Sequence, residues 1–216
     1  SNINHQNERG ATALIEAFDE RDLAIDNDTR THDHLIAVAR TLLDKGADPM
    51  VQDHEGQTAL HKAARYGNPK SIKILTDKMS HTATQDISGN TALHIALQNG
   101  MWENAEVLLK QLDDVNIKNH QGKSLLHDLC AHVRLLGQHK RKGLTKMIEE
   151  LIKAGADGSR DVRGNTVLFD VLNHGDIENA TLLYKQCPEI LATNYLHQSV
   201  LHHLSENCSN IKDTVR

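Results

Sequence analysis

The chain contains 15 histidines among its 216 residues, and histidine is the side chain that most often ligates metals or moves protons near neutral pH. Two local clusters stand out, one at His32 and His34 around an aspartate and one at residues 202–203. Adjacent residues on a helix point in different directions, so neither cluster favours a shared metal ion. The sequence has no His-Glu-x-x-His motif, no zinc-type Cys/His spacing and no complete calcium loop. We therefore predict no bound metal and no cofactor.

The nearest candidate for nucleophilic catalysis is the Cys130-Ala131-His132 segment, which places a thiol close to an imidazole. Cys130, however, falls at a position of a predicted helix where a small buried residue packs, so we expect it to fill core space. The other two thiols, Cys187 and Cys208, form no Cys-x-x-Cys pair, and all three are expected to be reduced. No glycine loop suited to a phosphate is present. The sequence thus predicts that the chain is not an enzyme.

Composition narrows the classes of partner. The formal net charge of −5 and the pI near 6.3 provide no general attraction to phosphate backbones or anionic lipid. No apolar run approaches the length of a membrane span. Aromatic residues make up only 3% of the chain, which favours thin layers of closely packed helices over one large core. We expect a monomeric, cytoplasmic protein that binds neither nucleic acid nor membrane.

A short pattern recurs along the chain at intervals of about 33 residues or somewhat more. Its clearest copies begin at Asp53 and Asp86, and each runs through a glycine and a threonine to a Leu-His pair. The strong copies occupy residues 53–61, 86–94, 119–127 and 161–169, with a fainter copy at 9–15 and a degraded one at 197–202. Self-similarity of this kind indicates an array of about six similar units.

Each part of the pattern has a physical reason. The glycines lie where the chain turns out of a hairpin tip and needs a left-handed backbone; they are Gly56, Gly89, Gly122 and Gly164. The hydroxyl residue that follows is expected to cap an inner helix, as at Thr58. A second, outer helix then carries apolar pairs, which are Ala39/Leu42, Ile72/Leu75, Ala105/Leu108, Ile148/Leu151 and Ala180/Leu183. One unit cannot bury such a stripe alone, so neighbouring units must stack.

The Gly-x-Thr-x-Leu-His opening resembles the ankyrin repeat, with alanine or another apolar residue where that family most often has proline. The resemblance covers nearly the whole chain and implies an all-α fold, an ankyrin-repeat solenoid of about six stacked helix-turn-helix repeats with short hairpin loops. We expect one domain over residues 3–216, with repeats at about 7–52, 53–85, 86–118, 119–160 and 161–193 and a partial repeat at 194–216. Residues 1–2 are expected to be a cloning remnant, and the natural chain is expected to continue beyond Arg216.

The resemblance also implies a structural role for the histidine that ends the motif. In the ankyrin family this side chain hydrogen-bonds the start of the inner helix and ties one repeat to the next. The positions concerned are His61, His94, His127 and His202. Because they lie one to a layer, they are not expected to share a metal ion.

Two repeats are longer than the others, and in both the extra residues fall between the inner and the outer helix. We expect one loop at residues 19–34, which is rich in acid, and another at residues 133–143, which carries the basic run 139–142. Their shared position predicts that both loops project from the same edge of the stack. Each loop could grip a partner or be a solvated surface segment, and the sequence leaves both alternatives open.

Ankyrin proteins bind through their hairpin tips and the concave face of their inner helices, so the resemblance implies a protein or peptide partner there. The residues at these motif positions are mostly polar, with scattered Arg, Tyr and His, a composition that suits a protein interface. They are His54, Glu55, Gln57, Arg65, Tyr66, Ile87, Ser88, Asn90, Gln98, Asn99, His120, Gln121, Lys123, His132, Val162, Arg163, Asn165, Asn173 and His174.

The leading hypothesis is therefore a non-enzymatic protein-interaction module, or scaffold. The alternative is a substrate-targeting ankyrin segment of a larger enzyme, or of a secreted bacterial effector, whose catalytic domain lies outside this chain. The drift of the repeats from consensus and the many Asn, Gln and His residues resemble the ankyrin-bearing effectors that intracellular bacteria inject into host cells. An effector of that kind would act in the host cytosol.

Overall fold

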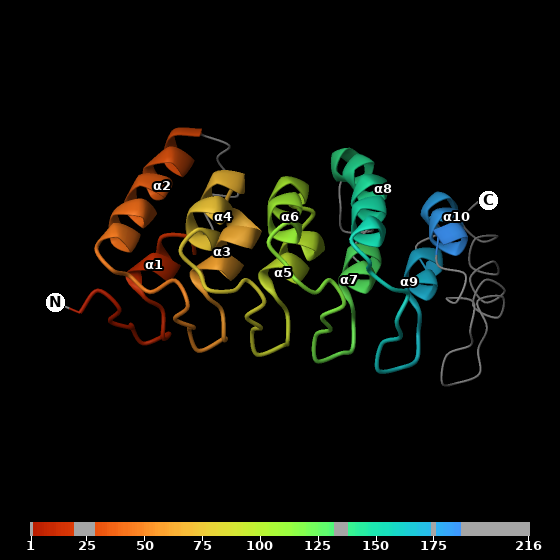
Figure 1. The fold of residues 1–216 in the computed structure, drawn as a ribbon, viewed down its shortest axis with the longest axis horizontal. Coiled ribbons are helices and arrows are strands. Elements are labelled where there is room, and N and C mark those ends of the chain that lie inside the picture. The colour runs from red at the N-terminus through yellow and green to blue at the C-terminus, as the bar shows by residue number, and fades with distance from the viewer. Residues whose placement is uncertain (1, 20–28, 132–137, 174–175, 187–216) are drawn as a thin grey trace, which may run out of the picture. The chain divides into compact units, whose positions relative to one another are not determined.

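The computed structural model describes residues 2–19, 29–131, 138–173 and 176–186, and every regular element within them is an α-helix (Figure 1). The helices are α1 (Ala13–Glu16), α2 (Thr29–Asp44), α3 (Ala59–Tyr66), α4 (Pro69–Thr76), α5 (Ala92–Gln98), α6 (Trp102–Leu109), α7 (Leu125–Ala131), α8 (Gln138–Lys153), α9 (Val167–Asn173) and α10 (Ile177–Gln186). The prediction of an all-α fold is confirmed. Of the helices described, none combines the length and the apolar character needed to cross a membrane.

The chain forms two compact units, Ser1–Asp114 and Val115–Arg216. In the first unit the inner helices α1, α3 and α5 pack side by side in one row, and the outer helices α2, α4 and α6 form a second row (Figure 1). Each inner helix also contacts the outer helix of its own repeat. In the second unit α7 contacts both α8 and α9, and α9 contacts α10. Pairs of short helices stacked in this way bury an apolar stripe that no single pair covers.

Threonine residues start the inner helices of the first unit. Thr12, Thr58 and Thr91 each have extended backbone and precede the first helical residue. The hydroxyl oxygen of Thr12 accepts a hydrogen bond from the amide of Ile15 at 3.3 Å, and that of Thr91 accepts one from the amide of His94 at 3.4 Å. These bonds satisfy amides that lack a partner within the helix, as the capping prediction requires.

Alanine sets the close spacing of the inner helices. Ala63 and Ala96 are fully buried, so neighbouring backbones approach each other with only a methyl group between them. Leu60 in α3 and Leu93 in α5 are each 1% exposed and add larger apolar side chains to the core. A core of this kind needs little aromatic area, which explains how 3% aromatic content suffices.

The outer helices bury the predicted apolar pairs, with one correction. Ala39 is fully buried, but Leu42 is only half-buried, and Leu43 takes the core position instead at 8% exposure. Among the α2 side chains that the structure describes, the buried ones are Ile36, Ala39 and Leu43. These lie three and four residues apart, the spacing that keeps one helical stripe facing the core.

The prediction of two long loops is wrong for most of the residues that the structure describes. Residues 29–34 are the first turns of α2, and residues 138–143 are the first turns of α8. Both helices have 16 residues, whereas α4 and α6 have 8. The run preceding the apolar stripe of α8 is rich in Gln, Lys and Arg, which favour helix, so the helix extends through it. Residues 20–28 and 132–137 lie outside the described residues.

Candidate functional site

The hairpin tips of the first unit are shaped by an aspartate that begins each copy of the pattern. The Oδ1 atom of Asp53 accepts hydrogen bonds from the amides of Glu55 and Gln57 at 2.9 and 2.8 Å. Asp86 holds the next tip in the same way, through the amides of Ser88 and Asn90. Because each carboxylate binds backbone two and four residues ahead, the tips are rigid loops.

Glycine is required in these tips for two reasons. Gly56 has a φ of 71°, in the left-handed region that L side chains rarely adopt. A Cβ atom placed there would also lie 2.9 Å from the amide nitrogen of Ile87 in the neighbouring tip. The predicted glycine positions of the pattern, from Gly56 to Gly164, all have positive φ.

Backbone hydrogen bonds join each tip to the next. In the first unit the amide of His54 donates to the carbonyl of Arg9 at 3.0 Å, and the amide of Ile87 donates to the carbonyl of Glu55 at 3.1 Å. In the second unit the amide of Val162 donates to the carbonyl of Gln121 at 3.1 Å. Each unit therefore presents its tip side chains in a fixed row, with no backbone rearrangement needed to align them.

The predicted surface residues of the first unit differ in how accessible they are. The tip residues His54, Glu55, Ile87 and Ser88 are exposed, and the isoleucine is 67% exposed. The half-buried residues, which lie along the inner helices and beside the tips, are Arg65, Tyr66, Asn90, Gln98 and Asn99.

Gln57 does not belong to this surface, because it is 7% exposed. Its backbone closes the neck of the hairpin, where the amide of Asp53 donates to the carbonyl of Gln57 at 2.9 Å. The Gln57 side chain is thus buried, whereas His54 and Glu55 at the tip beside it are exposed. A partner that binds the tips therefore has little access to Gln57.

Two polar contacts organise the half-buried residues. The guanidinium carbon of Arg65 lies 5.8 Å from the centre of the Tyr66 ring, a distance at which a cation attracts an aromatic face. The amide group of Gln98 donates to the side-chain oxygen of Asn90 at 3.4 Å, which links the end of α5 to the base of its own hairpin. These side chains form a polar band beside the tips.

The second unit carries its own set of predicted residues. His120, Gln121, Val162 and Arg163 are exposed at the tips, and Lys123 and Asn165 are half-buried. His132 and His174 lie outside the described residues. Asn173 ends α9, and its side chain also lies outside the description.

The motif histidines are structural, as the family resemblance implied. The Nδ1 atom of His61 lies 2.9 Å from the hydroxyl oxygen of Thr58, and Nε2 lies 3.1 Å from the carbonyl oxygen of Asn90 in the next repeat. His127 makes the matching bonds to Ser124 and Asn165. Burial lowers the pKa of both imidazoles, which favours the neutral ring. His202 lies outside the described residues.

No group of three or more His, Cys, Asp or Glu side chains that could hold a metal ion occurs in the described part of the chain. Cys130 is fully buried, which confirms its predicted core role, and burial raises the pKa of its thiol well above the ordinary value. A thiol in this state is a poor nucleophile at neutral pH.

Sequence reasoning missed a buried cation beneath the tips of the first unit. Lys62 is 8% exposed, and its ammonium nitrogen lies 3.3 Å from Asp19 Oδ1 and 3.4 Å from Asp53 Oδ2. Glu55 at the tip lies 3.9 Å away. A lysine directly after the motif histidine, beside a hairpin that carries two acids, was the available signal. The network fixes the tip that carries Glu55.

The hairpin of the first repeat was also missed as part of this surface. Glu8 and Arg9 are exposed at its tip, and the Arg9 guanidinium contacts the Glu16 carboxylate at 2.7 Å. Asn7 organises the loop through the amides of Arg9 and Ala11, as aspartate does in the later tips. The faint first copy of the pattern contained the signal, since its glycine and threonine occupy the usual places.

Part of the chain matches a known repeat family, and its fold is similar to that of solved structures. Residues 29–119 match the family model for ankyrin repeats, which spans three copies. The chain is similar to a solved ankyrin repeat domain from Acinetobacter baumannii AYE, with 23% identity, 86% of each chain covered and a TM-score of 0.70. A second solved ankyrin repeat protein matches with 21% identity over 86% of this chain and 85% of its own, also with a TM-score of 0.70.

Proposed function

We propose that this chain, which belongs to the ankyrin repeat family, binds a protein or peptide partner through the hairpin tips and inner-helix residues of its first unit. Ankyrin repeats are protein-interaction modules and are typically non-catalytic. The observation that carries the proposal is the row of exposed tips, joined by the backbone bonds from His54 to Arg9 and from Ile87 to Glu55. A surface that is already ordered loses little conformational freedom when a partner binds.

The chemistry of this row suits a protein. Ile87 offers an apolar side chain that is 67% exposed, and it lies between polar neighbours at the tips. Arg65 and Tyr66 add the two residue types that are enriched among the energetically important residues of interfaces. The carboxylate of Glu55 and the imidazole of His54 provide hydrogen-bonding groups at the rim. Together they form an apolar contact within a polar border, which is the usual anatomy of an interface.

The second unit supports a contact of the same kind. Val162 is 62% exposed at a tip whose backbone bonds to Gln121, and Arg163 and His120 are exposed beside it. We therefore include these tips in the proposal as a separate contact. The double variant His120→Ala/Lys123→Ala tests them independently of the first unit.

A cytoplasmic location is part of the proposal. Its support is that Cys130 is a free, buried thiol and that the chain holds three cysteines in all. An odd number of widely spaced cysteines favours a reducing compartment.

The experiment begins with affinity capture of partners and their identification by mass spectrometry, followed by measurement of Kd with a purified partner. We expect binding to weaken by about 2 kcal/mol or more in Arg65→Ala/Tyr66→Ala, and likewise in Ile87→Ala, if the replaced side chains lie at the centre of the interface. Their melting temperatures should stay close to wild type, because the side chains are at most half-buried.

Lys110→Glu is the matched control, since this exposed lysine caps α6 in the outer row of the same unit. It should leave Kd unchanged. If Lys110→Glu weakens the complex while the tip and inner-helix variants do not, the proposed surface is wrong.

A further inference from the structure

A hollow of about 410 Å³ lies between the outer helices α2 and α4 of the first unit. Its apolar lining consists of Ile36 and Leu43 from α2 and Ile74 from α4. Ile36 and Leu43 are 9% and 8% exposed, so they form a floor, while Ile74 is half-buried and reaches further out. The volume is enough for a few side chains, which makes the hollow a groove for a segment and not a seat for a whole domain.

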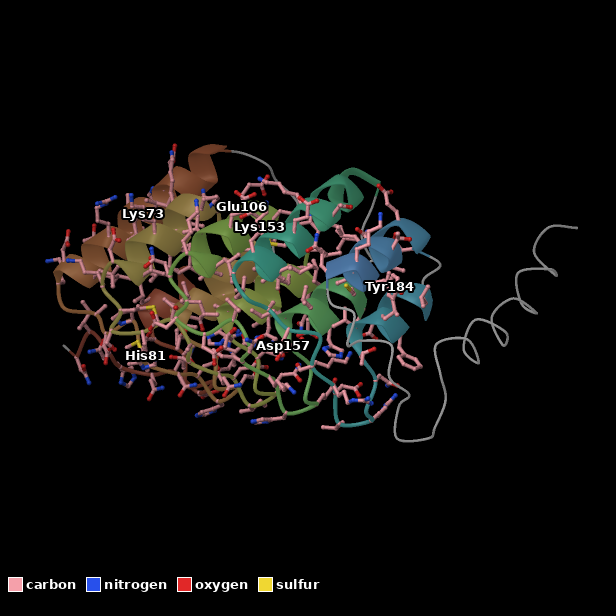
Figure 2. All side chains as sticks on the ribbon, turned by 45° about the vertical axis from the view of Figure 1, so that its right-hand side comes forward. Lys73, His81, Glu106, Lys153, Asp157 and Tyr184 are labelled. Carbon is pink, nitrogen blue, oxygen red and sulfur yellow. The ribbon has the colours of Figure 1, made fainter. Side chains whose placement is uncertain are left out.

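Cations surround this groove. Arg40 extends from α2, Lys70 and Lys73 extend from α4, and Lys78 follows the end of α4. All four are exposed. Figure 2 shows Lys73 among the outer helices, well away from the hairpin loops. Two carboxylates, those of Asp44 and Asp77, complete the lining, so positive charge is in excess here although the chain as a whole has a net charge of −5.

Most of these cations have no polar partner among the residues that the structure describes. Within the part of the chain that the structure describes, the side chains of Arg40, Lys73 and Lys78 make no hydrogen bond or ion pair. Lys70 contacts Asp33 at 3.6 Å, and both of those side chains are more than half exposed. Such a pair contributes little to stability and exchanges readily for another carboxylate. The groove therefore combines an apolar floor with cations that are available to an anionic partner.

We propose that this groove is a second docking site, which binds an acidic amphipathic helical segment of a partner protein. Apolar side chains on one face of the segment would enter between α2 and α4 and contact Ile36 and Ile74. Carboxylates on either side of that face would meet Arg40 and Lys73, which rise from the two walls of the groove. Binding of an amphipathic helix along a groove between two helices follows the usual chemistry of helix recognition. The site lies in the outer row and is independent of the hairpin tips.

The test uses a fluorescein-labelled helical peptide with a leucine face and glutamate flanks, and it measures Kd by fluorescence anisotropy. Two further peptides separate the contributions of charge and of apolar contact to binding. One has glutamine in place of glutamate, and the other has serine in place of leucine. Arg40→Glu/Lys73→Glu reverses the groove charge. Lys45→Glu/Lys110→Glu is the matched control, because both of these lysines are exposed and neither lines the groove. Far-ultraviolet circular dichroism confirms that each variant is folded.

We expect saturable binding of the leucine–glutamate peptide by wild type and by the control variant with the same Kd. The groove variant should bind at least about tenfold more weakly, and both altered peptides should bind more weakly to wild type. If the groove variant and the control variant weaken peptide binding equally, the binding depends only on the general charge of the protein, and the proposal is overturned. Absence of saturable binding to the wild type would also overturn it. The wild type could instead form a dimer that is lost in the Arg40→Glu/Lys73→Glu variant. That result would identify a second copy of the chain as the occupant of the groove and would also overturn the proposal.

Discussion

The ammonium nitrogen of Lys62 lies 3.3 Å from the carboxylate of Asp19, and this ion pair joins α3 of the second repeat to the segment that follows α1 in the first. Asp19 also contacts Arg9 at 3.3 Å, and Lys62 also contacts Asp53 at 3.4 Å. The network therefore connects two hairpins through one buried cation. Because its members come from both repeats, it holds the two tips in register.

Lys62→Met should destabilise the protein by about 2–4 kcal/mol, because it leaves the largely buried carboxylates of Asp19 and Asp53 without their cation. Urea unfolding followed by the fluorescence of Trp102, the single tryptophan, measures the change. Lys70→Met is the control, since Lys70 is 75% exposed and pairs with an exposed Asp33. Its effect should stay within about 1 kcal/mol. Equal losses from the two variants would contradict the structural role assigned to the Lys62 network.

The buried His61 makes stability depend on pH. Burial lowers its folded-state pKa below the ordinary 6.5, so in mildly acidic solution the unfolded chain binds a proton that the folded chain does not. Its contribution to stability is therefore complete above about pH 6.5 and is lost as pH falls from there through the folded-state pKa. His61→Gln should be less stable at neutral pH and should lose less on acidification. Parallel curves of unfolding free energy against pH for the two proteins would refute this account.

Asp170 should change the stability of the protein with pH in the direction opposite to His61. Burial raises the pKa of this carboxyl from 3.8 to about 7, with the nearby carboxylates of Asp161 and Asp128 adding to the shift and Lys123 opposing it. In the described part of the chain its Oδ2 atom accepts no hydrogen bond. The folded state therefore holds a proton that the unfolded state has lost, and stability falls as pH rises from about 4 to 7.

Asp170→Asn removes that ionisation and should raise the unfolding free energy at about pH 8 by roughly 1–4 kcal/mol. Below about pH 4 the variant and the wild type should be close, because the wild-type carboxyl is then neutral in both states. Thermal unfolding across this pH range provides the measurement. A variant that is less stable than wild type at pH 8 would show that the charged carboxylate is needed.

Leu93→Ala should destabilise the protein by about 2–5 kcal/mol, because the side chain is 1% exposed and its removal leaves a cavity between α5 and its neighbours. Ile87→Ala changes a side chain of similar size at the adjacent hairpin tip, where it is 67% exposed. Its effect should stay within about 0.5 kcal/mol. Chemical denaturation of both variants tests the contrast, and a large loss from Ile87→Ala would mean that the tip is part of the core.

Much of the fold follows from the sequence, because its signals are local. The left-handed turn at Gly56, the cap at Thr58 and the position of His61 all depend on residues a few places apart. The same local chemistry recurs at Gly89, Thr91 and His94, so the recurring turns and the starts of these inner helices follow the predicted pattern.

Only the tertiary structure decided which of these residues are available to a partner. Gln57 belongs to the motif positions of the predicted surface, yet its side chain is buried, while that of Ile87 is exposed. Residues 29–34 of the predicted loop before Ile36 are helix, and the groove between α2 and α4 exists because residues about 34 positions apart line it together, as Ile36 and Lys70 do. Local hydrogen bonds determine where a turn or helix begins, but burial and ion pairing depend on side chains from other repeats, whose distances no local pattern contains.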